Sequence, residues 1–236
     1  MGVMMQGRTP VCIGVDVGQI HDPTAISVAE VSQLPTGKYR YGEVAPAYFD
    51  RDGQWVPPQG ADPVLVSEYT IRHIGRLPLG TSYPDVAEHI ANMLCNPLLA
   101  ERAVRVLIDV TGVGRPVYDD LLKEVSLRQE ARHAQVRPIS FSHGEKYNRS
   151  TGTLGKAYLV SRLQSLLQGG RVHAPYTPEM KATLDELRVY EINVSQDGKD
   201  TYGASIGKHD DLATALALSC LEDPFGDTVI YGRRVY

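Results

Sequence analysis

The sequence predicts an α/β domain built on a mixed β-sheet, and the order of its apolar runs favours this class. Two β-rich runs at residues 11–17 and 24–31 are separated by GQIHDP, whose Gly, Asp and Pro are typical of a hairpin connection. A third alternating run, VLVSEYTIR, follows at 64–72. Helices and strands then alternate along the chain. We therefore expect a central mixed five-stranded sheet flanked by helices, with the first three strands antiparallel.

The middle of the chain supplies two helices and the last two strands of this sheet. TSYPDVAEHIANML predicts a helix with Ser82 as its N-cap, Pro84 in its first turn and apolar residues at 86, 90 and 94. VRVLIDV predicts a strand at 104–110, and a turn with two glycines then leads into a helix within 111–125. AQVRPISF predicts the fifth strand at 134–141.

The last third of the chain is predicted to be mainly helical. KAYLVSRLQSLLQGG is amphipathic from Lys156 and ends at two glycines, and a second helix is expected from about Pro178 to Val189. NVSQDGKDTYGAS has the Asp-Gly pair of a hairpin turn, so an added β-hairpin is expected near residues 190–205. The apolar stretch HDDLATALALSCLE predicts a final helix with acidic residues in its first turn.

Three segments complete the predicted organisation. Residues 34–62 are rich in Gly, Pro and Tyr, and are expected to be irregular or to hold an edge strand at 38–44. Residues 11–223 are expected to form one domain, after a disordered segment at 1–10 and before a C-terminal tail at 224–236. No internal repeat or sharp composition change divides this domain.

Composition narrows the classes of protein. No apolar run reaches the roughly 18–20 residues of a membrane span, and the N-terminus lacks a signal-peptide pattern, so a cytoplasmic protein is expected. Cys12, Cys95 and Cys220 show no CxxC spacing, which argues against disulfides and zinc. The net charge is −4, yet residues 126–175 carry six more basic than acidic residues. That run favours either a phosphate-contacting face or an ordinary solvated basic surface.

The first strand contains an acid where a core residue is expected. Asp16 interrupts the apolar run VCIGVDVG, and burying an ionised carboxylate without a partner is costly. Asp109 ends the strand VRVLIDV, while Asp210 and Asp211 open the last helix. If the first and fourth strands are neighbours, Asp16 and Asp109 project from adjacent positions, and a helix laid across the sheet brings a third acid to them.

Carboxylates that converge in this way repel one another unless cations lie between them. Hard oxygen ligands without a Cys or His cluster favour Mg²⁺ or Mn²⁺, and a pair of such ions suits phosphodiester hydrolysis. Simpler roles compete with this hypothesis. Asp109 is a possible turn former, Asp210 and Asp211 are possible N-caps, and Asp16 can be satisfied by a buried Arg or by backbone donors.

Three stretches together resemble a known family. VCIGVDVGQIHDPTAI, VRVLIDVTGVGRPVYDDLL and GKHDDLATALALS resemble the C-terminal nuclease domain of the large terminase subunit of tailed bacteriophages and prophages, which has an RNase H-like fold. The helix LVSRLQSLLQGGRVHAP and the later LDELRVYEI are also similar to that family. The resemblance covers about residues 11–221, and DVTGVGRPV and GKHDDLATALAL are its most specific parts.

The resemblance implies a metal-dependent endonuclease that cuts concatemeric viral DNA during packaging in the cytoplasm of the bacterial host. Asp16 then matches the acid that bridges two divalent cations, Mg²⁺ or Mn²⁺, and Asp109 the acid of the fourth strand. The third ligand is Asp210 or Asp211, and the sequence leaves this choice open. The hairpin around Asp197 and Gly198 matches an element near the mouth of the active site.

Several basic residues are candidate accessory or DNA-contacting groups. His209 is a candidate for orienting a ligand or phosphate, and Lys208 for contacting the DNA backbone; exposed loop positions are the alternative for both. Arg149, Lys146 and Lys156 come from the basic run. The implied partners are double-stranded DNA, a terminase small subunit and a portal protein. The chain lacks the P-loop of the family's ATPase motor, so either an excised domain or a stand-alone protein is expected.

Other classes share part of this pattern. A Holliday-junction resolvase of RNase H-like fold would have the same acidic residues, and a non-catalytic DNA-binding assembly module would keep the fold without the activity. The sugar-kinase and actin-like superfamily also begins with a strand such as IGVDVG, but it needs two related domains and a second phosphate loop. No helix-turn-helix or zinc-finger pattern is present, so low sequence preference is expected.

Overall fold

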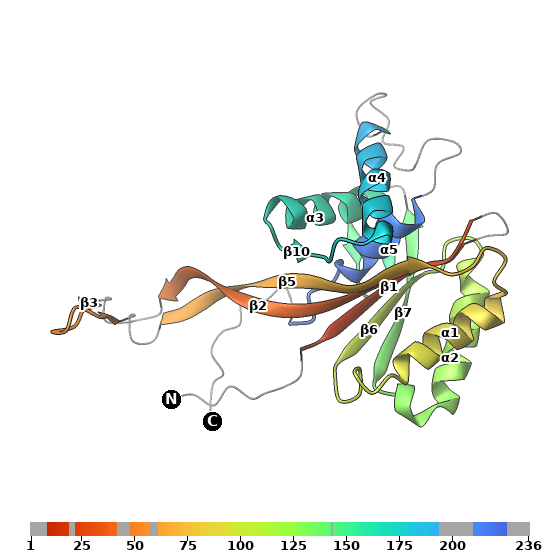
Figure 1. Ribbon diagram of the computed structural model, residues 1–236, viewed down its shortest axis with the longest axis horizontal. Helices are drawn as coiled ribbons and strands as arrows, with labels where there is room; N and C mark the ends of the chain where they lie inside the picture. Colours follow the sequence, from red (N-terminus) through yellow and green to blue (C-terminus); the bar gives the residue numbers. More distant parts are fainter. Residues whose placement is uncertain are drawn as a thin grey trace.

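The fold is organised around an eight-stranded mixed sheet with helices on both faces (Figure 1). The computed structural model describes residues 9–18, 22–41, 48–56, 61–142, 144–193 and 210–225. The strand order is β10-β5-β2-β1-β6-β7-β9-β8. The strands of this sheet are β1 (Val11–Asp16), β2 (Ala25–Tyr41), β5 (Ala61–Arg76), β6 (Val104–Asp109), β7 (Ala134–Ser142), β8 (Tyr147–Asn148), β9 (Thr153–Gly155) and β10 (Val172–His173).

The five predicted strands form the centre of the sheet. Strand β2 pairs antiparallel with both β1 and β5, as expected for the first three strands. Strands β1, β6 and β7 are parallel neighbours. The predicted mixed sheet and its antiparallel start are therefore confirmed. The additional strands β8, β9 and β10 are two or three residues long, too short to show a periodic pattern in the sequence.

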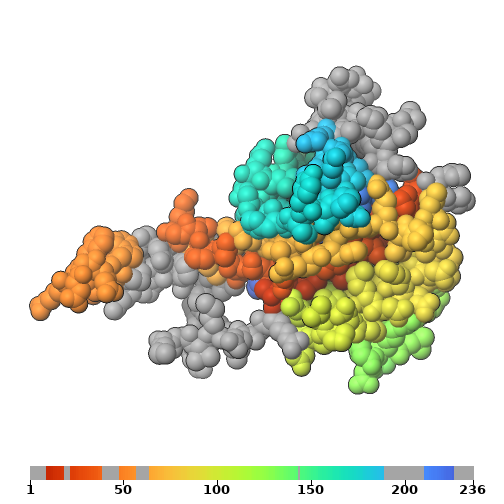
Figure 2. All heavy atoms as spheres, viewed as in Figure 1, coloured from red at the N-terminus to blue at the C-terminus, as the bar shows by residue number. Residues whose placement is uncertain are grey.

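The region predicted to be irregular contributes a long two-stranded arm. Strands β2 and β5 remain paired from the sheet out to Tyr41 and Ala61, with a register shift between Pro35 and Tyr39. A separate hairpin of β3 (Tyr48–Phe49) and β4 (Trp55–Val56) lies beyond them, and Figure 2 shows it projecting away from the body of the molecule. Of the two alternatives for residues 34–62, the edge strand at 38–44 is therefore present as far as Tyr41, whereas an irregular conformation is wrong for the residues that continue β2 and β5.

Two helical layers cover the sheet. Helices α3 (Lys156–Gln168), α4 (Pro178–Asn193) and α5 (Asp211–Ser219) lie on one face, and α1 (Tyr83–Leu94) and α2 (Gly114–Leu127) lie on the other (Figure 1). A short 3₁₀ helix at Gln129–Ala131 precedes β7.

Strand alternation assigns each side chain of β1 to one of two cores. Val11, Ile13 and Val15 pack with α1 and α2, whereas Cys12 packs on the opposite face with α3 and α5. Each large apolar side chain removed from water in this way contributes about 1.5–3 kcal/mol. Since successive strand residues point to opposite faces, Asp16 shares the α5 face with Cys12.

The helix boundaries follow local signals closely. The Ser82 hydroxyl accepts a 3.3 Å hydrogen bond from the Asp85 N–H at the start of α1, as predicted. The predicted apolar positions Val86, Ile90 and Leu94 are all buried. Helix α4 continues to Asn193, so the expected hairpin does not begin at 190; residues 194–209 lie outside the described part of the chain. None of the helices described is long and apolar enough to cross a membrane.

Candidate metal centre

The candidate site lies at the carboxyl edge of the parallel strands. Asp16 is the last residue of β1 and Asp109 the last residue of β6. The parallel register pairs Val15 with Ile108, so the two acids follow at adjacent positions in the next row. Ligand sites in sheets of this kind lie outside the carboxyl ends of the strands.

Alternation also places the two acids on the same face of the sheet. Val15 and Ile108, which precede them, both pack in the core with α1 and α2. Asp16 and Asp109 therefore point to the opposite face, where Leu107 packs with α5. The expected adjacency of the first and fourth strands is confirmed by this pairing.

Helix α5 lies unusually close to the sheet, which brings its first residues toward these acids. A Cβ at Gly14 would lie 2.2 Å from the Ala215 carbonyl oxygen and 2.5 Å from the Ser219 backbone nitrogen. Any side chain at residue 14 would therefore push α5 away from β1. The small hydroxyls of Ser27 and Ser219 complete the contact with a buried 2.9 Å hydrogen bond.

The two acids at the start of α5 occupy different positions. Asp210 is the N-cap residue but makes no side-chain cap hydrogen bond, so the simpler interpretation as a capping group does not hold for it. Asp211 is the first helical residue and is only 7% exposed. The Glu186 carboxylate of α4 takes the capping role instead, accepting a 2.9 Å hydrogen bond from the Ala213 N–H.

The electrostatics show that the four acids influence one another. Burial raises the pKa of Asp16 well above 3.8, and the charges of Asp109, Asp211 and Asp210 raise it further, while Lys156 lowers it. Burial also raises the pKa of Asp109, and the 2.7 Å hydrogen bond from the Thr111 N–H partly offsets that rise. Like charges held this close favour either a proton or a cation between them.

The chemistry of these donors suits a hard divalent cation. The group consists of carboxylate oxygens, without a thiolate and with no imidazole among the described residues that affect the pKa of Asp16. Within the described ranges, however, no three His, Cys, Asp or Glu side chains are already gathered as a complete ligand set. The fit to Mg²⁺ or Mn²⁺ therefore rests on donor type and charge.

Lys156 is the predicted basic residue that reaches the acids. It begins α3 directly after β9, and its ammonium lowers the pKa of both Asp16 and Asp109. Its Nζ also lies 5.5 Å from the centre of the Phe141 ring. Because β9 runs parallel to β7, Lys156 emerges at the same edge of the sheet as the acids.

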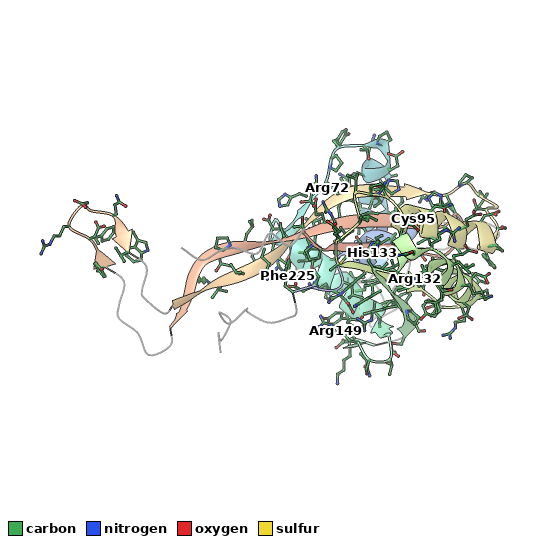
Figure 3. All side chains as sticks on the ribbon, turned by 90° about the horizontal axis from the view of Figure 1, so that it is seen from below. Arg72, Cys95, Arg132, His133, Arg149 and Phe225 are labelled. Carbon is green, nitrogen blue, oxygen red and sulfur yellow. The ribbon has the colours of Figure 1, made fainter. Side chains whose placement is uncertain are left out.

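The other predicted basic residues are placed differently. Lys146 is exposed, and its carbonyl accepts a 2.8 Å hydrogen bond from the Gly155 N–H, beside Lys156. Arg149 lies in the connection after β8, at the margin of the molecule in Figure 3. His209 and Lys208, and the hairpin residues Asp197 and Gly198, lie outside the described ranges.

Several arginines of the basic run serve the fold, a role that neither expected alternative, a phosphate-contacting face or a solvated basic surface, had included. Arg137 binds the buried Glu222, and Arg128 pairs with Glu124 on α2. Arg162 donates a 3.0 Å hydrogen bond to the Tyr69 hydroxyl. Spacing in the sequence could not show this, because the arginines point toward different elements.

Arg76 and Glu186 belong to the site but were not identified from the sequence. Arg76 ends β5 and lies in the same row of the sheet as Asp16, since Ala25 pairs with both. Its guanidinium contacts Asp211 and Glu186. The predicted strand stopped at Arg72, where a register shift interrupts the alternation, so the only available signal was a basic residue four positions further on.

Comparison with known proteins identifies the family and the fold. Residues 80–222 match the family model described as the terminase RNaseH-like domain. The chain is similar to the large terminase nuclease from thermophilic phage G20c, at 20% sequence identity and a TM-score of 0.53, over 91% of this chain and 82% of that chain. It is also similar to the human cytomegalovirus terminase nuclease domain, in a Mn-soaked and inhibitor-bound structure, at 13% identity and a TM-score of 0.45, over 96% and 88% of the two chains.

No curated protein matches the sequence significantly. The likeness to the phage nuclease shows a shared fold, which confirms the predicted RNase H-like class. The family model matches more than half of the chain, across the segment that contains Asp109 and the start of α5. This protein therefore belongs to the terminase RNase H-like domain family.

Proposed function

We propose that this chain is a metal-dependent endonuclease that hydrolyses phosphodiester bonds of double-stranded DNA during viral genome packaging. The observation that supports it best is that Asp16 and Asp109 end adjacent parallel strands, while the charges of Asp210 and Asp211, from a distant part of the sequence, also raise the pKa of Asp16. A structural role for this many acids is disfavoured, because their charges raise the pKa of Asp16.

Asp16, Asp109 and either Asp210 or Asp211 are the residues that would hold the divalent cations. A pair of such ions supplies activation of the attacking water and stabilisation of the leaving oxygen. Asp211 is the more buried of the two acids, at 7% exposed, and belongs to the helix. We therefore assign Asp211 as the direct ligand from α5 and Asp210 as a second acid beside it.

The proposed DNA contacts are the basic groups near this edge. Lys156 is proposed to contact a phosphate there, because its charge already lowers the pKa of Asp16. Lys146 is exposed on the adjoining hairpin and Arg149 follows it, so both are proposed to contact the DNA backbone. The roles of Lys208 and His209 remain predictions from the family resemblance.

The cellular setting is part of the same proposal. Concatemeric viral DNA is the proposed substrate, in the cytoplasm of the bacterial host. Since the sequence shows no base-reading motif, cutting positions would be chosen by partners. The proposed partners are an ATPase motor domain, a terminase small subunit and a portal protein.

A plasmid-cleavage assay tests the proposal. With Mg²⁺ or Mn²⁺ the protein should nick and linearise supercoiled plasmid, and chelator should abolish this activity. Asp109→Asn should reduce the cleavage rate by at least ~100-fold, since even the loss of an outer partner of a metal ligand costs 10–100-fold. Asp185→Asn makes the same chemical change at an exposed position of α4 and should cleave normally.

Four outcomes would contradict the proposal. Metal-independent cleavage, or normal cleavage by Asp109→Asn, would rule out the metal mechanism. Preferential cutting of four-way junctions over linear duplex would instead support the resolvase alternative. Failure to cut any DNA while binding duplex normally would support the non-catalytic module.

A further inference from the structure

Arg76 is the basic residue that approaches the acids from the third strand of the sheet. It ends β5, whereas Lys156 approaches them from β9 and α3. Asp16 and Arg76 lie in one row across the sheet, because Ala25 of β2 pairs with both of them. Because paired residues of neighbouring strands point to the same face, Arg76 lies on the face that α5 covers.

The Arg76 guanidinium joins three elements. Its Nε donates a 3.3 Å hydrogen bond to Asp211 Oδ2, at the start of α5. Its Nη2 donates a short hydrogen bond to Glu186 Oε1, on α4. The Arg76 side chain is 30% exposed, and those of Asp211 and Glu186 are 10% exposed, so both ion pairs are largely shielded from water.

Glu186 ties the same network to the backbone of α5. Its second oxygen, Oε2, accepts the Ala213 N–H at 2.9 Å, while its first oxygen binds Arg76. One carboxylate therefore fixes both the end of the helix and the arginine that contacts its first residue. A planar guanidinium is well suited to this geometry, because its N–H groups point in fixed directions.

We propose that Arg76, held by Glu186, is a positioning residue that orients the Asp211 carboxylate for binding a divalent cation. This inference rests on the proposed function. Arg76 fixes the side chain of Asp211, and Glu186 fixes the helix end that presents it. Outer partners of this kind orient ligands and are worth 10–100-fold in metal affinity.

Direct Mn²⁺ binding, measured by titration calorimetry without DNA, tests the proposal. Arg76→Met keeps most of the aliphatic stem but removes both ion pairs, and should weaken Mn²⁺ binding by at least ~10-fold. Arg72→Met is the matched control: Arg72 lies on the same strand, is labelled in Figure 3, and pairs with Glu30 instead. The control should bind Mn²⁺ as the parent does.

The opposite result is also informative. Removing a positive charge beside the acids would by itself tighten cation binding. If Arg76→Met binds Mn²⁺ as well as the parent or more tightly, Arg76 only competes with the cation, and the proposal is wrong. If that variant does not fold, as judged by its circular dichroism, Glu186→Gln replaces it, because the amide oxygen can still accept the Ala213 N–H. It should weaken Mn²⁺ binding in the same direction.

A double-mutant cycle separates positioning from a general effect on the fold. In an Asp211→Asn background, Arg76→Met should weaken Mn²⁺ binding by much less than in the parent, because the carboxylate that it orients is already gone. Equal losses in both backgrounds would overturn the proposal. If the parent binds no Mn²⁺, the metal part of the proposed function is refuted. If the parent and Arg76→Met bind Mn²⁺ equally well, only the positioning role is refuted.

Discussion

The buried carboxylates near the two ends of helix α5 differ in whether arginines balance their charge. Beyond its C-terminus, Glu222 is 1% exposed and is neutralised within the chain: Arg137 Nη1 lies 2.7 Å and 2.9 Å from its two oxygens, and Arg105 lies 3.6 Å away. At its N-terminus, Asp16 and Asp109 form no ion pair within the described residues. Glu222 is thus neutralised by arginines of the protein, whereas Asp16 and Asp109 have no such ion pair among the described residues.

The hydroxyls around Glu222 strengthen this contrast. Tyr147 donates its hydroxyl to Glu222, and burial together with this contact raises the pKa of Tyr147. The Tyr69 hydroxyl donates a 3.2 Å hydrogen bond to the Glu222 carbonyl. A buried acid with a full set of donors stabilises the fold. A buried group of mutually repelling acids costs stability, and such groups are frequent at functional sites.

The largest effect is expected from removing Glu222, the buried acid whose charge is balanced by two arginines. Glu222→Ala leaves Arg137 and Arg105 without their shared carboxylate, and should lower the free energy of unfolding by about 3–5 kcal/mol. Urea denaturation measures this change. If the free energy of unfolding falls by less than about 1 kcal/mol, the comparison fails, because the ion pairs of Glu222 would then not stabilise the fold.

The next effect has opposite signs for activity and stability. Asp16→Asn should lower the cleavage rate by at least ~100-fold. It should also raise the melting temperature at pH 7 without metal, because it removes one of the charges that repel one another at this edge. Plasmid cleavage and a thermal melt of the same sample check both parts. A lower melting temperature would mean that Asp16 is paired like Glu222.

The pH dependence of the metal-free parent follows from the same pKa. The folded pKa of Asp16 lies above its unfolded value near 3.8, so the folded state binds more protons between these two values. Stability should therefore fall as the pH rises through that window. This slope should be smaller in Asp16→Asn, and urea denaturation at several pH values measures it.

A smaller effect is expected from the contact that holds α5 on the sheet. Gly14→Ala places a methyl group 2.2 Å from the Ala215 carbonyl oxygen, and should destabilise the protein by about 1–3 kcal/mol. It should also reduce cleavage, since α5 must move and carry Asp211 with it. Gly144→Ala is the control, because its Cβ would lie 3.8 Å from the nearest atom, Ser142 Oγ.

The smallest effect concerns another paired acid, Glu30. Burial alone would raise its pKa, but hydrogen bonds from Arg102, Thr9 and Arg72 lower it to about 2. The resulting stability is present above pH 4.5 and is lost as the pH falls toward 2. Arg72 is largely exposed, so Arg72→Met should cost less than about 1 kcal/mol at pH 7. Chemical denaturation of the variant measures this cost.

Some residues of the site can be predicted from the sequence, and others cannot. Asp16 stands out in the sequence because it interrupts an apolar run, and Asp109 because it ends one; such patterns are local properties. The N-terminus of α5 was predictable from HDD followed by an apolar helix. These local signals, together with the family resemblance, were enough to bring the acids to one edge.

Arg76 and Glu186 were not predictable for a physical reason. The register shift between Val28 and Ala29, opposite Ile71 and His73, breaks the alternation of β5 just before Arg76. Glu186 lies on α4, and its meeting with α5 depends on how two helices pack over the sheet. The ion pairs of Glu222 were not predictable for the same reason, because Arg105 and Arg137 lie on strands far from it in sequence.

The arm beyond the sheet has a practical consequence for spectroscopy. Trp55 is the only tryptophan of the chain; it lies on β4, is 54% exposed, and packs edge-on against Phe49 with 5.3 Å between the ring centres. Tryptophan emission therefore reports on the tip of the arm rather than on either core. A fluorescence signal that changes early in a denaturation series would record the loosening of β3 and β4, while far-ultraviolet circular dichroism follows the helices that hold the acids.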